Sequence, residues 1–168
     1  MATDKVRILN PSETLLLSRD AKILALRWDL VPWGLVLDCD APVEEGRAIR
    51  RAWIVFDGVS DISWSMKSAR LPNGFFGADA MTASGRVEGV CQYELPVLTP
   101  TFVDADTMSG NPHNSITIRA ARLIGAVSAS TGEFGDFGPN MQQRNALAAE
   151  EEFLLAIAAE LTLRATTP

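Results

Sequence analysis

The sequence contains little histidine and little cysteine, and both shortages limit the chemistry that it can perform. Its 168 residues include one histidine, His113, and two cysteines, Cys39 and Cys91. Zinc sites usually take three or four ligands from histidine, cysteine and carboxylate side chains, and no such ligand spacing is present. Both cysteines fall at inward positions of expected strands, where a free cysteine usually acts as a small buried side chain. The composition therefore predicts neither a metal site nor a disulfide.

The sequence also lacks the short motifs that carry common enzyme chemistry. It contains no G-x-S-x-G, no H-E-x-x-H and no glycine pattern of a Walker or Rossmann nucleotide site. Residues 131–139 place glycine at every third position, but no Lys-Ser/Thr pair follows and the acidic residues there would repel phosphate. We therefore expect no cofactor. The missing motifs lower the expectation of an enzyme without excluding one, because active sites assemble from residues distant in sequence.

Long apolar runs and an excess of positive charge are absent as well. No apolar stretch approaches the roughly 20 residues of a membrane-spanning helix, and residues 1–5 lack the start of a signal peptide. The formal net charge is −6, with a local basic cluster at Arg47, Arg50 and Arg51. Phosphate binding needs a basic surface, so nucleic acid is an unfavourable ligand. We expect a cytoplasmic protein, bacterial by its alanine-rich composition, that binds neither membranes nor nucleic acid.

Alternating apolar residues are the main positive signal, and they dominate residues 22–64. Apolar side chains at every second position, such as Leu24, Leu26 and Trp28, predict strands with one buried face. Residues 52–56 are apolar on both faces, which favours a central strand. Asp-Gly at positions 57–58 lies between two such runs and predicts a tight hairpin, because both residues tolerate a positive φ. Short connections indicate antiparallel neighbours.

The last part of the chain has the composition of a helix. Residues 140–164 are rich in alanine, glutamate and leucine, and Asn140 is placed to cap the helix start with Gln143 in the reciprocal position. One apolar stripe at helical spacing contains Leu147, Leu154, Ile157, Ala158 and Leu161. We expect this stripe to lie against the sheet or against a second copy of the helix.

These patterns together predict one domain that spans residues 1–168. The fold class is mainly β: an antiparallel β-sandwich or half-open barrel of roughly eight to ten strands with one C-terminal helix. Residues 1–130 form the expected antiparallel β region, residues 131–139 a Gly/Phe loop and residues 140–164 the helix. The length suffices for a core that needs no disulfide or metal.

Four tryptophans in the first two-fifths of the chain are candidate ligand-binding residues: Trp28, Trp33, Trp53 and Trp64. Aromatic clusters line pockets for sugars and apolar ligands. They also fill small β cores, since each tryptophan buries on the order of 200 Å². The alternation of Trp28 and Trp64 with polar neighbours favours core positions, and a ligand pocket is the alternative.

Two elements near the C-terminus are candidate partner-binding surfaces. Phe134 and Phe137 are flanked by glycine, and they either anchor a partner or fold under the sheet to seat the helix. The cost of exposing two aromatic rings favours the second interpretation. The acidic run Glu150, Glu151 and Glu152 fits ordinary solubility, or an acidic face that attracts a basic protein.

Carboxylates supply the remaining candidate site. Asp38 and Asp40 share one strand face, where paired carboxylates can bind a hard cation or share a proton. The alternation instead favours the wet side of a strand end. Asp104, Asp106 and His113 lie close in sequence, so an acid–base site can be imagined, but a turn with a solvated imidazole is the favoured interpretation.

Three functional hypotheses result from these residues. The preferred one is a non-catalytic module that binds another protein, or a second copy of itself, through residues 150–152 and the Phe134/Phe137 loop. Small acidic proteins that neutralise a basic toxin are an analogy for this role. The second is a small-molecule-binding β domain with a tryptophan-lined pocket, and the third is a hydrolase-like enzyme that uses the Asp/His cluster.

Overall fold

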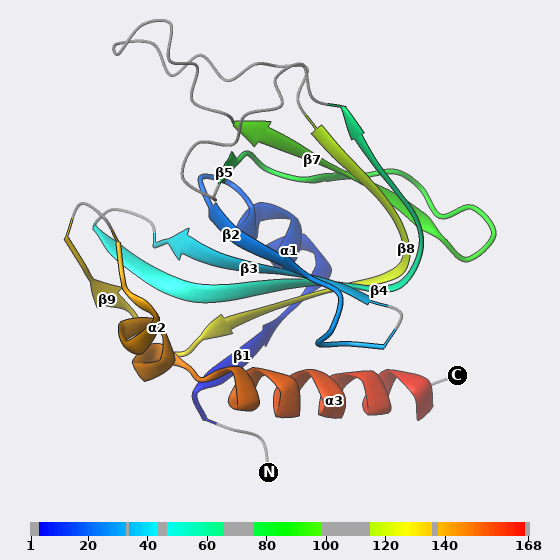
Figure 1. Ribbon diagram of the computed structural model, residues 1–168. Coiled ribbons are helices and arrows are strands. Elements are labelled where there is room, and N and C mark those ends of the chain that lie inside the picture. Colours follow the sequence, from blue (N-terminus) through cyan, green and yellow to red (C-terminus); the bar gives the residue numbers. More distant parts are fainter. Residues whose placement is uncertain are drawn as a thin grey trace, which may run out of the picture.

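The protein is built mainly from β-strands, with helices near both ends of the sequence (Figure 1). The computed structural model describes residues 4–32, 34–43, 47–65, 76–98, 115–135 and 138–166. In these ranges the strands are β1 (Val6–Leu9), β2 (Lys22–Arg27), β3 (Gly34–Pro42), β4 (Ala48–Ser65), β5 (Phe76–Ala78), β6 (Thr82–Ala83), β7 (Cys91–Leu98), β8 (Ser115–Ser128) and β9 (Gly132–Glu133). The helices there are α1 (Pro11–Leu17), α2 (Met141–Leu147) and α3 (Glu150–Thr166).

Six antiparallel strands close into a barrel. Their order around the ring is β8-β4-β3-β2-β5-β7, and the pairing of β7 with the first half of β8 closes it. The second half of β8 pairs with β1, so one edge of this long strand has two partners in turn. The prediction of a mainly β, antiparallel fold with a C-terminal helix is confirmed, and of its two alternatives the structure has the barrel, which is closed rather than half-open.

Apolar side chains fill the barrel interior, and α1 packs against them. The rings of Phe56 and Tyr93 meet edge to face there, with their centroids 5.5 Å apart. Leu15 and Leu17 of α1 pack against this core. The helix also approaches β8 closely, because a Cβ added at Gly125 would lie only 2.6 Å from the hydroxyl oxygen of Thr14.

A second apolar layer covers the outer face of β3, β4 and β8. Trp53 and Ile124 of the strands pack there with Phe153 and Ile157 of α3, which lies along the outside of the sheet (Figure 1). Residues 52–56 are therefore buried on both faces. Since β4 also pairs with β3 on one side and β8 on the other, the prediction of a central strand is confirmed.

The predicted hairpin at Asp57-Gly58 is wrong, because β4 continues through both residues. Gly58 has a φ of +65°, as a turn would require, but Asp57 does not share it. Asp57 pairs with Arg122 and Val59 with Ala120, so the register with β8 is regular across Gly58 and shifts only between Val59 and Asp61. A glycine can adopt this positive φ without strain, and here it does so inside one long strand rather than in a turn.

The predicted helix over residues 140–164 is divided into α2 and α3. Asn140 caps α2 in a reciprocal arrangement with Gln143, as the sequence indicates. Ala148 then adopts an extended conformation, with φ −162° and ψ 131°, which ends α2. Its carbonyl oxygen accepts a hydrogen bond from Arg51, and Glu152 caps the new helix by accepting from the amide of Ala149 at 2.7 Å. Contacts distant in sequence therefore stabilise the break.

Candidate functional site

Asp38 and Asp40 lie on the outer face of β3, where both are buried. The prediction that they occupy the wet side of the strand is wrong, because α2 covers that side. Arg144 of α2 donates from Nε to Oδ1 of Asp40 at 2.9 Å and from Nη2 to Oδ2 at 2.7 Å. Such a bidentate arginine–carboxylate pair is a strong and directional form of ion pair.

Arg51 of β4 is the centre of the same buried network. Its side chain is 2% exposed, and Nη1 donates to the Asn145 side chain at 2.7 Å and to the Ala148 carbonyl at 2.9 Å. Nη2 lies 3.5 Å from a carboxylate oxygen of Asp38, which is a weak contact. Burial raises the pKa of Asp38, and the charge of Arg51 opposes that rise.

Two aromatic rings continue the network into the apolar layer. The Arg51 guanidinium lies 4.8 Å from the centroid of the Trp53 ring, within cation–π range. Trp53 in turn stacks on Phe153 of α3, with centroids 4.5 Å apart and an angle of 8° between the ring planes. One continuous stack therefore connects the charged groups beneath α2 with the underside of α3.

This buried network supports a structural role for Asp38 and Asp40. Its ionisable members are two carboxylates and two guanidiniums of balanced charge, and solvent reaches little of them. Burying charges is tolerable only when they are paired and hydrogen-bonded, as most of these are. The arrangement presents no hydroxyl, thiol or imidazole to a substrate, and it holds α2 against the sheet.

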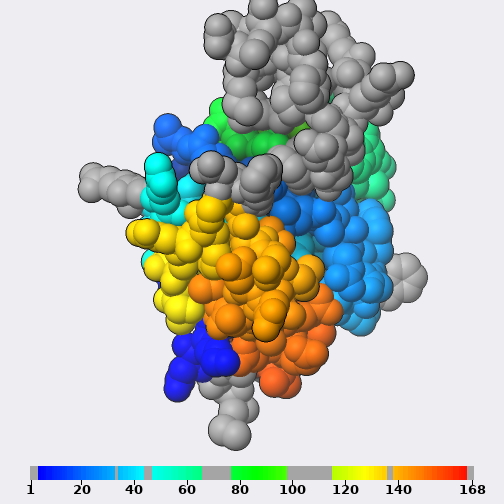
Figure 2. Space-filling view, turned by 60° about the vertical axis from the view of Figure 1, so that its left-hand side comes forward, coloured from blue at the N-terminus to red at the C-terminus, as the bar shows by residue number. Residues whose placement is uncertain are grey.

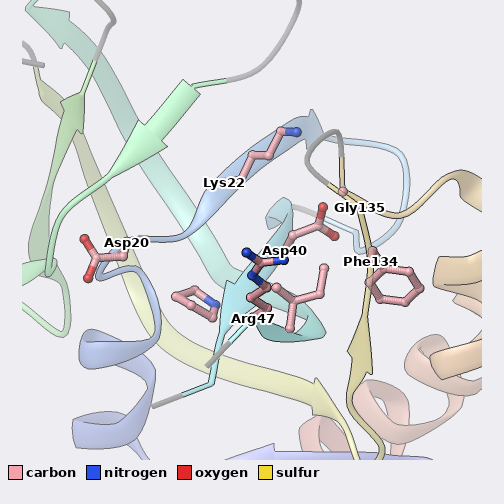
Figure 3. A pocket seen from close by; sticks show the side chains of 9 residues that line it. Asp20, Lys22, Asp40, Arg47, Phe134 and Gly135 are labelled. Carbon is pink, nitrogen blue, oxygen red and sulfur yellow. The ribbon is translucent and has the colours of Figure 1, made fainter. Parts of the chain in front are cut away.

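A small cavity borders the network beside the loop of Phe134 (Figure 3). It has a volume of about 230 Å³, and its walls include Lys22, Asp40, Arg47 and Gly135. The half-buried ring of Phe134 occupies the space above Gly132, where an added Cβ would lie 2.5 Å from the ring. This packing agrees with the interpretation that Phe134 folds inward.

The three tryptophans that the structure describes lie in different surroundings. Trp53 is fully buried, whereas Trp28 is 53% exposed and Trp64 47% exposed. The core positions favoured for Trp28 and Trp64 are therefore wrong. Trp28 lies just beyond the end of β2, and Trp64 is the second-last residue of β4, so both are at strand ends that the core does not cover. Neither the cavity beside Phe134 nor the groove between α1 and the strands is lined by a tryptophan, and Trp33 lies outside the described residues.

Two of the three glutamates at the start of α3 form ion pairs, and the third is exposed. Glu150 pairs with Arg27 at 3.2 Å, and Glu152 pairs with Lys5 at 3.1 Å. The hydrogen bond from the Ala149 amide, and then Lys5, lower the pKa of Glu152. Glu151 is exposed. Two of the three predicted partner-binding glutamates therefore anchor α3 to the rest of the chain.

The outward face of α3 exposes large apolar side chains to solvent. Figure 2 looks onto α2 and α3, whose orange atoms form a large part of this side of the molecule. Leu155 is 59% exposed and Leu163 is 64% exposed. The exposed residues of the helix are Glu151, Leu155, Ala158, Ala159, Thr162, Leu163 and Ala165. Of these exposed residues only Glu151 is charged, because Glu150, Glu152, Glu160 and Arg164 are partly buried and ion-paired. An exposed helix face is ordinarily richer in charge.

Other kinds of site receive no support from the described ranges. There, no three His, Cys, Asp or Glu side chains form a group that could hold a metal ion. Within the same ranges, no helix has the length and apolar character needed to cross a bilayer. Asp104, Asp106, His113 and Phe137 lie outside the described residues, so the Asp/His hypothesis and half of the Phe loop remain predictions.

Sequence reasoning missed the two arginines that organise the buried network. Arg51 belongs to the basic cluster that the sequence displays, but Arg144 lies in the helical tail without any distinguishing pattern. Their partners Asp38 and Asp40 are distant in sequence, so only the fold brings the four groups together. No protein-family model, curated protein or solved structure matches this chain.

Proposed function

We propose that the chain is a non-catalytic protein-interaction module whose partner covers the outward face of α3. One observation carries this proposal: the exposed face of a 17-residue helix holds leucine, alanine and threonine with a single charge, Glu151. A helix that is apolar on both sides is usually buried on both sides. The inward side already packs on the sheet through Phe153 and Ile157, which leaves the outward side for a partner.

The chemistry of this face favours a partner with an apolar patch and a basic rim. The net charge of the chain is −6, and the charge on the face itself is negative. Complementary charge accelerates association and excludes acidic competitors, including a second copy of this chain. Neutralisation of a basic toxin is one role of this kind.

A photo-crosslinking residue at position 155 tests the proposal in the source cell. We expect it to form an adduct with a second, basic polypeptide, because Leu155 lies at the centre of the proposed interface. The matched control is position 87, since Val87 is 63% exposed but lies on a β-turn away from α3. Absence of an adduct at position 155, or equal adducts at both positions, would contradict the proposal. An adduct with the chain itself would replace the basic partner by a homodimer.

Binding of the purified partner then identifies the face. Leu155→Lys combined with Ala159→Lys places two charges on exposed positions of α3 and leaves its buried side unchanged. We expect the dissociation constant to rise at least about tenfold, because interface centres tolerate added charge poorly. Val87→Lys should bind like the wild type, and circular dichroism should be the same for all three proteins. Undiminished binding by the double variant would remove this face from the proposal.

A further inference from the structure

A groove of about 680 Å³ lies between α1 and the strands that it packs on. One wall comes from β1, β3, β4 and β8, and includes Arg7, Leu9 and Arg50. The other comes from α1 and the turn after it, and includes Leu16 and Arg19. The volume falls within the range of roughly 300–1,000 Å³ that is typical of small-molecule sites. The groove therefore has the size of a ligand site.

The charge of this groove is opposite to that of the whole chain. It is lined by three arginines and two acidic residues, although the net charge of the protein is −6. Arg7 is paired with Glu13 at 3.2 Å. Arg19 and Arg50 form no ion pair with any residue that the structure describes, and Asp20 is the remaining acid. The lining thus has a positive charge that the chain itself does not neutralise.

Arg50 supplies a second, independent indication of a ligand. It is half-buried, and its Nε is buried without a hydrogen-bond acceptor among the described residues. A buried donor without an acceptor costs stability, so such groups in native proteins usually have a partner. The register Arg50–Ala41 places it on the face that carries Ala52 and the barrel core, toward α1 rather than toward α2. A ligand in the groove would provide the acceptor.

The rest of the groove lining is mainly apolar, which favours a ligand that has an apolar part besides its charged group. Leu16 of α1 is 63% exposed, and it stands with Leu9, Leu17, Pro42, Val43 and Val127 around the groove. Arginine prefers planar or tetrahedral oxyanions, because its guanidinium matches carboxylate and phosphate geometry. We propose that the groove binds an organic anion, with a carboxylate or phosphate head at Arg50 and Arg19 and an apolar body beside Leu16. This site is separate from the α3 surface.

Isothermal titration calorimetry with three probes of equal chain length tests the proposal on the full chain. The probes are octanoate, octyl phosphate and the neutral 1-octanol. We expect saturable one-to-one binding of at least one anion and none of 1-octanol, since the arginines recognise the head. The anion that binds identifies the head as carboxylate or phosphate. No saturable binding of either anion, or equal binding of 1-octanol, overturns the proposal.

Arginine variants locate the site. Arg50→Met should raise the dissociation constant of the anion at least about tenfold, because it removes the guanidinium and keeps an apolar stem of similar length. Arg19→Met should weaken binding several-fold. Because Arg19 is exposed, this variant tests the site even if Arg50→Met disturbs folding. Arg119→Met is the matched control, since Arg119 is exposed on β8 and does not line the groove. Equal affinity of the wild type, Arg50→Met and Arg19→Met would place the anion elsewhere and refute the assignment.

Discussion

Arg51→Met tests the buried network, because Arg51 joins the sheet to the break between α2 and α3. Methionine keeps the apolar stem beside Trp53 but removes every hydrogen bond of the guanidinium. Asn145 and the Ala148 carbonyl each lose a donor, and Asp38 loses its nearest positive charge. Removing one partner of a buried ion pair costs about 3–5 kcal/mol. We expect the free energy of unfolding to fall by about 4 kcal/mol, near the middle of that range.

The pH dependence of the lost stability distinguishes the electrostatic contribution of Arg51 from its packing contribution. Burial already raises the pKa of Asp38 above its ordinary value of 3.8, and the nearby Arg51 limits the rise. Without Arg51 the folded-state pKa rises further. A group with a raised folded-state pKa favours the folded state fully below its unfolded pKa, and loses that contribution as pH rises through the folded pKa. The deficit of Arg51→Met should therefore be largest near neutral pH and smaller toward pH 4.

Urea unfolding followed by tryptophan fluorescence, near neutral pH and near pH 5, measures both effects. A second variant, Arg51→Met with Asp38→Asn, removes both charges and keeps the shape of the pair. Near neutral pH we expect it to recover about 2 kcal/mol of the loss, since the uncompensated carboxylate is gone. A deficit that is the same at both pH values, or a double variant no more stable than the single one, would refute the reasoning.

Two further predictions concern α1. Gly125→Ala should cost about 1–3 kcal/mol, because its Cβ would collide with Thr14, whereas Gly85→Ala has nothing within 4 Å and should stay within about 0.5 kcal/mol of the wild type in thermal unfolding. Asn10→Ala should cost about 1 kcal/mol, because Asn10 and Glu13 cap each other's backbone at 2.8 and 2.9 Å. Asn10→Ser keeps the cap and should be nearly neutral, and an equal loss in both variants would contradict the capping argument.

Strand alternation predicted the fold class because inward packing on the barrel is a property of each strand. Residues 52–56 are apolar at successive positions, and all five are fully buried. The hairpin prediction at Asp57-Gly58 is wrong because a glycine can adopt a positive φ within a strand as well as in a turn. Glycine allows the positive φ at position 58. Whether the chain then forms a hairpin or continues as one strand is decided by the pairing of β4 with β8, which is distant in sequence.

The first helix could have been found in the sequence, whereas the buried network could not. Asn10, Pro11 and Glu13 form a recognisable helix start, with a capping residue, an N1 proline and a reciprocal acid. Asp38 and Asp40 carry no comparable signal, because their burial depends on a helix about a hundred residues later. Alternation reports which residues share a face, and tertiary packing decides whether that face meets water.

The position of the glutamates on α3 determines how its surface has to be tested. Three acidic residues in the first helical turn are favoured by the helix dipole, so their presence needs no partner. Reversing all three would break the pairs of Glu150 with Arg27 and of Glu152 with Lys5, and would also remove the cap of α3. Weaker binding by such a variant would then report a displaced helix. Substitutions at exposed Leu155 and Ala159 avoid this ambiguity, because neither side chain holds α3 in place.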